Sequence, residues 1–257
     1  MISSFRLNDS TTQRSPLSLF RLILDPPREA SLNMAVDEML ALSQSTENAQ
    51  PTLRFYAWSE PSITTGYFQN VERVAQIFQA SKKGIPVVRR LSGGGAVLHG
   101  NDLTFSFSLP VSNPFMPTDV KSSYLKINEV VRVGLKPDHP TIDYADCRTV
   151  PSGKRESKEK ICFESPVCYD LLLSGRKILG SSQRRIGKCL LHQATLFLSQ
   201  DKDLSIRRIL EGFESSWKAT FEERPLSREE LSEAQKIEED RYASSDWALF
   251  RERSFFS

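Results

Sequence analysis

The segment VVRRLSGGGAVLHGNDLTFSFSL, residues 87–109, places three consecutive glycines between two stretches with the composition of strands. After the glycines, Phe105, Phe107 and Leu109 alternate with serines, which predicts a strand with one buried face. A dinucleotide-binding loop requires GxGxxG at the start of a helix, and a Walker A loop requires Lys followed by Ser or Thr after its last glycine. This segment meets neither condition, so both kinds of nucleotide-binding loop are excluded.

Three glycines are also more than a turn between strands requires, since one or two are enough. A third suggests that a ligand comes close to the backbone. A binding wall and a tight turn both remain open for this run. The run consists of Gly93, Gly94 and Gly95. His99 is a candidate for shaping a pocket and equally for a core histidine with a satisfied hydrogen bond. Arg89 and Arg90 are expected either to meet an acidic partner or to form a solvated strand end.

Outside this segment, strands and helices mix without strict alternation, which places the chain in the α+β class. Strands are predicted at residues 20–24, twice within 51–67, and at 86–89, 169–173, 177–179 and 190–198. Helices are predicted at 30–45, 71–80, 121–135 and 203–213. A further helix is expected after Ser227, because Ser227 and Glu230 form a capping box. Ser174 and Gly175 separate two of the strands and predict a hairpin.

Composition limits the possible functions only weakly. The chain has 257 residues, 39% hydrophobic and 26% charged, which suits one large domain. A net charge of +2 gives no global attraction to nucleic acid or to an anionic membrane, and no apolar run has transmembrane length. Residues 1–17 are expected to form a flexible tail, 18–257 a single domain, and 151–160 a mobile, solvated loop. The polar N-terminus shows no secretory signal, so a cytoplasmic location is expected.

The cysteine pattern predicts neither a disulfide framework nor a metal site, because four cysteines without CxxC spacing suit neither. In a reducing interior, a cysteine is then either a small buried residue or a reactive group. Cys168 and Cys189 have apolar strand neighbours and are predicted to be buried residues. Cys147 lies in a loop and receives no role. Cys162 differs from these three because polar and charged residues surround it.

A lysine that follows Cys162 completes a candidate reactive pair. Lys177 lies on the second strand of the predicted hairpin, and Cys162 lies between the basic loop and that hairpin. A free thiol has a pKa of about 8.5 and is mostly protonated near neutral pH, whereas a nearby ammonium group stabilises the thiolate. A Cys–Lys pair can accept an acyl group as a thioester and pass it to an amine.

Several segments occur in the order found in the lipoate–protein ligase and octanoyltransferase superfamily. They are RFYAWSEPSITTGYFQN, VVRRLSGGGAVLHGNDLTFSFSL, CFESPVCYDLLLSGRKILGSSQRR and LLHQATLFL, and RYASSDWAL resembles the family's C-terminal signature. The resemblance covers nearly the whole chain and implies a mixed β-sheet flanked by helices, as in biotin/lipoate protein ligase catalytic domains. Residues 18–257 would form that catalytic domain. The family binds a medium-chain acyl group in a tunnel beside the glycine-rich loop and forms an amide on a carrier lysine.

Around the cysteine, the chain resembles the octanoyltransferase branch, in which CF-[DE]-x-P precedes GRK-[IV]-x-G-[SA]-x-Q-x-R. Cys162 matches the nucleophile of that branch, and Lys177 matches the lysine that supports the thiol and the acyl carbonyl. The substrate-binding residues implied by the resemblance are Arg89, Arg90, Gly93, Gly94, Gly95 and His99. The implied donor is acyl carrier protein, and the acceptor is a lipoyl domain or a glycine-cleavage H-type protein. No cofactor, nucleic acid or membrane is expected to take part.

Three other functions remain open at this point. An ATP-dependent lipoate–protein ligase on the same fold would need ATP and magnesium, and Cys162 would be incidental. An amidotransferase would move lipoyl or octanoyl groups between two carrier proteins, also through a cysteine. A non-catalytic member of the fold would bind the carrier and show no turnover.

Overall fold

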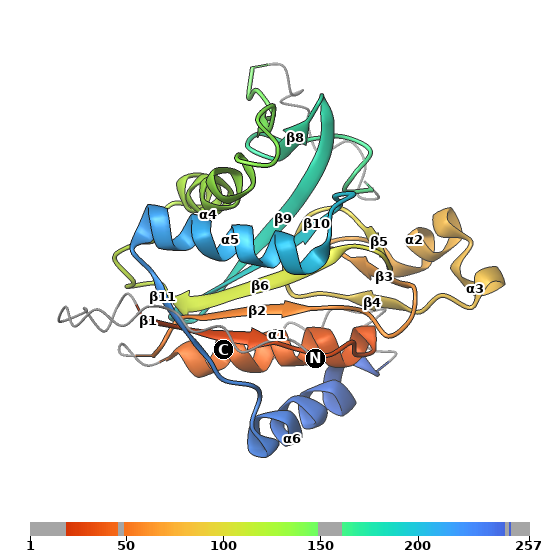
Figure 1. Cartoon of the computed structure of the whole chain (residues 1–257). Helices are drawn as coiled ribbons and strands as arrows, with labels where there is room; N and C mark the ends of the chain where they lie inside the picture. The colour runs from red at the N-terminus through yellow and green to blue at the C-terminus, as the bar shows by residue number, and fades with distance from the viewer. Residues whose placement is uncertain (1–18, 46–48, 149–160, 245–246, 248–257) are drawn as a thin grey trace.

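A mixed eight-stranded sheet forms the centre of the protein (Figure 1). The computed structural model describes residues 19–45, 49–148, 161–244 and 247. Across the sheet the strands are β11 (Thr220–Glu223), β1 (Leu19–Leu24), β2 (Thr52–Tyr56), β6 (Leu103–Pro110), β10 (Cys189–Leu196), β9 (Arg176–Ile186), β8 (Leu171–Leu173) and β7 (Asp143–Tyr144). β1 pairs in parallel with β11 and with β2, and the other neighbouring pairs are antiparallel.

A second, three-stranded sheet carries the glycine run. Its strands are β4 (Val87–Arg89), β3 (Ser62–Thr65) and β5 (Val97–His99), in that order. Because β4 and β5 pair with opposite edges of β3, the connection between them passes over the end of β3. Gly66 makes this passage possible, since a Cβ at this position would lie 2.0 Å from the carbonyl oxygen of Gly94. The loop that contains the glycine run therefore makes the turn and also packs its backbone directly against Gly66.

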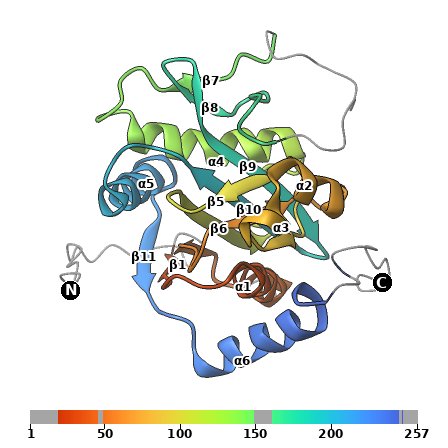
Figure 2. The same ribbon diagram turned by 90° about the vertical axis from the view of Figure 1, so that its right-hand side faces the viewer.

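Helices cover both faces of the large sheet (Figures 1 and 2). On one face α4 (Val120–Leu135) packs against α5 (Lys202–Trp217), and on the other α1 (Ala30–Leu42) packs against α6 (Arg228–Ile237). The helices α2 (Val71–Phe78) and α3 (Ala80–Lys83) lie beside the small sheet, and the short turns η2 (Ser43–Ser45) and η3 (Glu238–Tyr242) follow α1 and α6. The aromatic centre of the largest core lies between α5 and the large sheet. It consists of the buried rings of Phe213 and Trp217 from α5 and of Phe20 and Phe107 from the sheet.

The α+β class is confirmed, and the predicted helices and strands form close to their expected positions. The hairpin between β8 and β9 turns at Ser174 and Gly175, which have φ values of 50° and 78°. The capping box at Ser227 is present at the start of α6. The short edge strands β7 and β11 were not predicted, because so few residues show no clear alternation. The two strands predicted within 51–67 both form, but they belong to different sheets.

Two predicted segments cannot be compared with the structure. The tail at 1–17 and the loop at 151–160 lie outside the described residues. Among the helices that the structure describes, none combines the length and the apolar character needed to cross a bilayer.

Candidate active site

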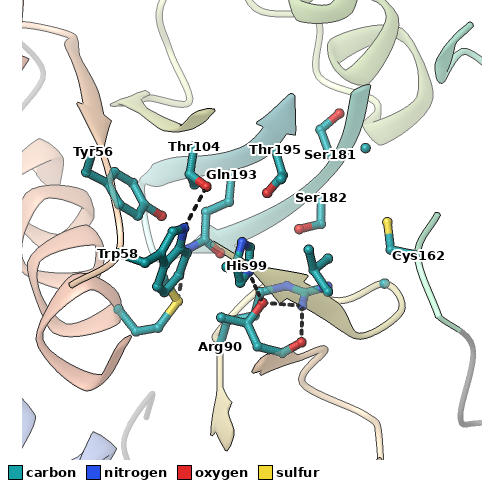
Figure 3. A pocket seen from close by; sticks show the side chains of 15 residues that line it. Tyr56, Trp58, Arg90, His99, Thr104, Cys162, Ser181, Ser182, Gln193 and Thr195 are labelled. Atoms are coloured by element: carbon teal, nitrogen blue, oxygen red, sulfur yellow. Dashed lines mark hydrogen bonds between the residues drawn. The ribbon is translucent and has the colours of Figure 1, made fainter. Parts of the chain in front are cut away.

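A cavity lies where the small sheet meets the large one (Figure 3). The glycine run with β3 and β5 forms one wall, β6, β9 and β10 form the other, and Met34 of α1 contributes an apolar side chain. The sequence-predicted site residues that line this cavity are Arg90, Gly94, His99 and Cys162. The cavity is narrow, with a volume of about 30 Å³. Four segments that are distant in the sequence thus meet at one point.

Cys162 is held at the cavity by the backbone of the glycine segment. Ile161 forms an isolated parallel bridge with Ala96, and the Cys162 N–H donates to the Ala96 carbonyl oxygen at 2.8 Å. The thiol is free and partly exposed. The nucleophile candidate and the glycine wall are therefore fixed to each other through the main chain.

Lys177 of β9 contacts both the backbone and the sulfur of Cys162. Its Nζ donates to the Cys162 carbonyl oxygen at 2.7 Å and to Sγ at 3.3 Å. It also pairs with the carboxylate of Asp170 at 2.7 Å. Gly180 leaves the space for this arrangement, because a Cβ there would lie 2.9 Å from Sγ and 3.0 Å from the Cε of Lys177. The structure thus brings together the two residues predicted to be catalytic.

Arg90 binds the backbone of the glycine run through hydrogen bonds and adds positive charge near Cys162. Its Nη2 donates to the carbonyl oxygens of Gly93 and Gly95, at 2.5 Å and 2.9 Å. Burial lowers the pKa of Arg90 to about 10, although the negative charge of a Cys162 thiolate acts in the opposite direction. Gly94 itself faces the cavity with a φ of 89°, a conformation that favours glycine.

His99 both lines the cavity and has satisfied hydrogen bonds, so its two predicted roles coincide. Its Nδ1 lies 2.9 Å from an oxygen of Asp102, its Nε2 lies 2.9 Å from the Thr64 hydroxyl, and its ring stacks on Trp58. Burial lowers the pKa of His99, despite the opposing effect of Asp102. Burial alone would raise the pKa of Asp102, but hydrogen bonds from His99 and Thr104 outweigh it and bring it to about 2.

Comparison with known proteins identifies the family. The model of the lipoyl protein ligase A/B catalytic domain matches residues 29–230. The chain belongs to the lipoyl protein ligase A/B catalytic-domain family. It is 34% identical over 188 residues to the protein named octanoyltransferase LipM of Moorella thermoacetica, covering 73% of this chain and 68% of that one. To the LipM of Bacillus subtilis it is 28% identical over 258 residues, covering 84% and 93%.

Solved structures share the fold of this lipoyl ligase family member. A putative lipoate protein ligase from T. acidophilum superimposes with a TM-score of 0.73 at 23% identity, covering 90% of this chain and 98% of that one. A lipoate–protein ligase A bound with ATP gives a TM-score of 0.73 at 24% identity, covering 89% and 98%. The predicted mixed sheet flanked by helices is therefore confirmed.

In this family member Arg89 lies behind the cavity and does not line it. Its guanidinium donates to the carbonyl oxygens of Tyr67, Gln69 and Trp247. Arg89 and Arg90 are both buried, so the expectation of a solvated strand end is wrong, and neither is available to an acidic carrier at the surface. The reason is that the chain from β3 to α2 and the residue Trp247 cover the end of β4, which a strand prediction does not show.

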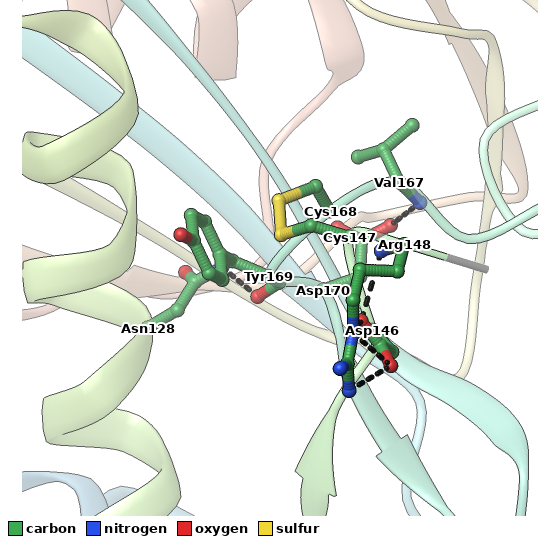
Figure 4. The surroundings of a disulfide bond; sticks show 8 residues. All are labelled: Asn128, Asp146, Cys147, Arg148, Val167, Cys168, Tyr169 and Asp170. Carbon is green, nitrogen blue, oxygen red and sulfur yellow. Dashed lines mark hydrogen bonds and ion pairs between the residues drawn. A yellow bond between two sulfur atoms is a disulfide. The ribbon is translucent and has the colours of Figure 1, made fainter. Parts of the chain in front are cut away.

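The prediction for Cys168 is also wrong, because it forms a disulfide with Cys147 (Figure 4). The antiparallel pairing of β7 with β8 brings the two cysteines together, and their Cα atoms lie 4.5 Å apart. Since β7 was not predicted, no sequence pattern indicated that the two cysteines pair. Cys189 is fully buried and its thiol contacts the Ile186 carbonyl oxygen, so its predicted burial is confirmed.

Sequence reasoning missed a polar network behind the cavity. Gln193 of β10 accepts a hydrogen bond from Ser92 and donates to Asp37 of α1 at 2.8 Å. Asp37 also accepts from Tyr56, at 2.9 Å, and from Arg54, at 2.8 Å. Amide and acidic residues inside otherwise apolar strand and helix segments were the available signal, because buried polar groups need partners.

His192 lies within β10 and is fully buried. Its Nδ1 lies 3.0 Å from the side-chain nitrogen of Gln183, and Nε2 has no partner. Burial lowers the pKa of His192 from 6.5 to about 3. The folded protein therefore holds this histidine neutral in a pH range where the unfolded chain would protonate it.

Acidification should destabilise the fold through this histidine. Because the folded pKa of His192 lies below the unfolded value, the stability that depends on the neutral imidazole is fully present above pH 6.5. This stability is lost as pH falls toward about 3. The free energy of unfolding should fall by about 1.4 kcal/mol per pH unit, or about 2 kcal/mol at pH 5. Urea unfolding at several pH values measures this slope. A His192→Asn variant, which keeps an acceptor for Gln183, should show a shallower slope; equal slopes would contradict the prediction.

Proposed function

We propose that Cys162 accepts an octanoyl group as a thioester and passes it to a lysine of a lipoyl domain. The chain is an octanoyltransferase that acts in protein lipoylation, as the octanoyltransferase names of its relatives in several species support. The observation that carries the thioester step is the position of the Cys162 thiol, which faces the cavity 3.3 Å from the ammonium of Lys177.

In the first step, the donor is an octanoyl thioester of acyl carrier protein. The Cys162 thiolate attacks the thioester carbonyl, the bond to the carrier sulfur breaks, and the carrier leaves as a thiol after taking up a proton. The ammonium of Lys177 and the guanidinium of Arg90 supply positive charge beside Sγ, which stabilises the thiolate and the oxyanion of the tetrahedral intermediate.

In the second step, the neutral amine of the acceptor lysine attacks the thioester on Cys162. The new amide C–N bond forms, the C–S bond breaks, the amine loses its proton, and Cys162 returns as a thiolate. Covalent catalysis of this kind divides one transfer into two easier steps and produces ping-pong kinetics. The acceptor is a lipoyl-domain protein, and a glycine-cleavage H-type protein is part of the same proposal. Because the donor is already activated, the reaction requires neither ATP nor a metal.

The acyl chain lies along the glycine wall in this proposal. The cavity is narrow, and we expect side chains along it to turn aside when an eight-carbon chain enters. Met34 is suited to this movement, because its unbranched side chain adapts readily. The resulting interior is apolar beside Val97 and Trp58 and polar near Gln193.

Intact-protein mass spectrometry tests the proposal with three donors supplied separately, without acceptor. These are octanoyl-acyl carrier protein, octanoic acid with ATP and magnesium, and an octanoylated lipoyl domain. We expect a hydroxylamine-sensitive gain of one octanoyl group with the first donor, located on Cys162 by peptide mapping. Acceptor acylation that requires ATP, with no adduct, would indicate a ligase. Acylation by the third donor alone would indicate an amidotransferase, and no transfer with any donor would indicate a carrier-binding protein.

A further inference from the structure

We infer that Asp170 is the counter-ion that keeps Lys177 protonated while Cys162 carries the acyl group. The inference rests on the proposed function, because it concerns the acyl-enzyme. Asp170 is a positioning residue in this role: its carboxylate contacts Lys177 and acts on the reaction through that ammonium.

The hydrogen-bond geometry suits an ammonium at Lys177. Its Nζ lies within reach of three acceptors, namely the Asp170 carboxylate at 2.7 Å and the carbonyl oxygen and sulfur of Cys162 at 2.7 Å and 3.3 Å. A neutral amine has only two N–H groups, whereas an ammonium has three. The side chains of Lys177 and Asp170 are only 3% and 0% exposed, so water does not replace any of these partners.

Acylation removes one of the two negative charges beside Lys177. In the free enzyme, a Cys162 thiolate and the Asp170 carboxylate both face the ammonium. In the acyl-enzyme the sulfur is a neutral thioester, and only Asp170 remains. A buried cation without an anion is strongly disfavoured. Without Asp170, Lys177 would release its proton at this stage. With Asp170, it can still donate a hydrogen bond to the thioester oxygen when the acceptor amine attacks.

The fold fixes Asp170 before any substrate arrives (Figure 4). One carboxylate oxygen accepts from the Val167 N–H at 2.7 Å and the other from the Tyr124 hydroxyl at 2.6 Å. The preceding residue, Tyr169, has a φ of 71°, and the Cys147–Cys168 disulfide closes the same turn. A carboxylate held by this many contacts keeps its place when Cys162 changes charge.

The test separates the two half-reactions in Asp170→Asn and the wild type. Each protein is first octanoylated by octanoyl-acyl carrier protein, and the rate of acylation is recorded. The isolated acyl-enzyme is then treated with hydroxylamine, or with unmodified lipoyl domain, between about pH 7 and about pH 9. Intact mass follows the loss of the octanoyl group. Glu129→Gln, which removes a partly exposed carboxylate on α4, is the matched control.

We expect Asp170→Asn to slow deacylation at least about tenfold, with a larger effect at higher pH. The same substitution should slow acylation less than about threefold. The wild type and Glu129→Gln should lose the acyl group to hydroxylamine at a rate that does not fall with pH. Equal deacylation profiles of Asp170→Asn and wild type would overturn the inference, as would a defect seen only with the lipoyl domain.

The wild-type profile also tests the inference without any variant, in case Asp170→Asn does not fold. A wild-type hydroxylamine rate that falls between about pH 7 and about pH 9 would mean that Asp170 does not keep Lys177 protonated. The outcome is separate from the proposed function: absence of any adduct on the wild type refutes the thioester step, whereas a normal adduct with a normal variant refutes only the role of Asp170.

Discussion

Cys162→Ala should reduce octanoyl transfer by about 10⁴-fold or more, because it removes the atom that forms the thioester in the proposed mechanism. Steady-state transfer from octanoyl-acyl carrier protein to a lipoyl domain measures the loss. The fold should be unaffected, since Cys162 is only partly buried and alanine keeps the contacts made by its backbone N–H and carbonyl oxygen. The melting temperature of the variant should therefore stay close to that of the wild type.

Cys189→Ala is the matched control for this variant. Cys189 is the second free cysteine of the described chain, fully buried in β10 and outside the cavity. Its replacement should lower stability modestly and leave the transfer rate per folded molecule nearly unchanged. If Cys162→Ala kept more than about a hundredth of the activity, a direct transfer without a thioester would have to replace the proposed mechanism.

Arg54→Met should lower the free energy of unfolding by about 3–5 kcal/mol, because it leaves the buried Asp37 carboxylate without its cation and removes one of the two cations at Asp25. Arg54 is fully buried, and its guanidinium pairs with Asp25 at 2.7 Å and with Asp37 at 2.8 Å. Burial alone would raise the pKa of Asp25, but the hydrogen bond from Arg28 and the charge of Arg54 hold it below its usual value. Urea unfolding near neutral pH measures the loss.

Arg132→Met provides the comparison for Arg54→Met. Arg132 pairs with Glu129 at 2.8 Å on the surface of α4, where the two side chains are 18% and 37% exposed. Loss of such a solvated pair should cost less than about 1 kcal/mol. A loss of similar size for the two arginines would show that the buried network contributes little. Because Asp37 also binds Gln193 in the cavity wall, Arg54→Met should weaken substrate binding in the molecules that remain folded.

Local patterns in the sequence predicted most elements of the fold. The strand β6 and the capping box at Ser227 depend on residues close in sequence, and both are present. The single buried face predicted for β6 is wrong, because helices cover both faces of the large sheet (Figure 1) and every residue of β6 is buried. The assignment of β2 and β3 to separate sheets depends on which distant strands they pair with, β1 and β6 for the first and β4 and β5 for the second. No local pattern contains this information, so the junction that forms the cavity was not predicted.

The candidate site shows the same division. The charged surroundings of Cys162 and its distance from Lys177 along a hairpin indicated a pair that the structure places in contact. Arg89 and Arg90 occupy consecutive positions in the sequence, but one guanidinium binds the segment at Tyr67 and the other the glycine run. The contact between Asp170 and Lys177 was not predicted, because an acidic residue before an apolar strand has many possible partners. Only the distances in the structure identify Lys177 as its partner.

The proposed nucleophile belongs to a connecting segment, and the cavity lies between strands of the two sheets. Cys162 is attached to the β-structure through the Ala96–Ile161 bridge, whereas the opposite wall of the cavity is formed by the long strands β9 and β10. Stability and reactivity are therefore encoded in different parts of the chain. Mutation of the connector can change the reaction without disturbing the core, and mutation of the strands can change the accepted chain length without moving the sulfur. Such a division lets one scaffold acquire new acyl-transfer chemistry in small steps, each of which leaves a folded protein.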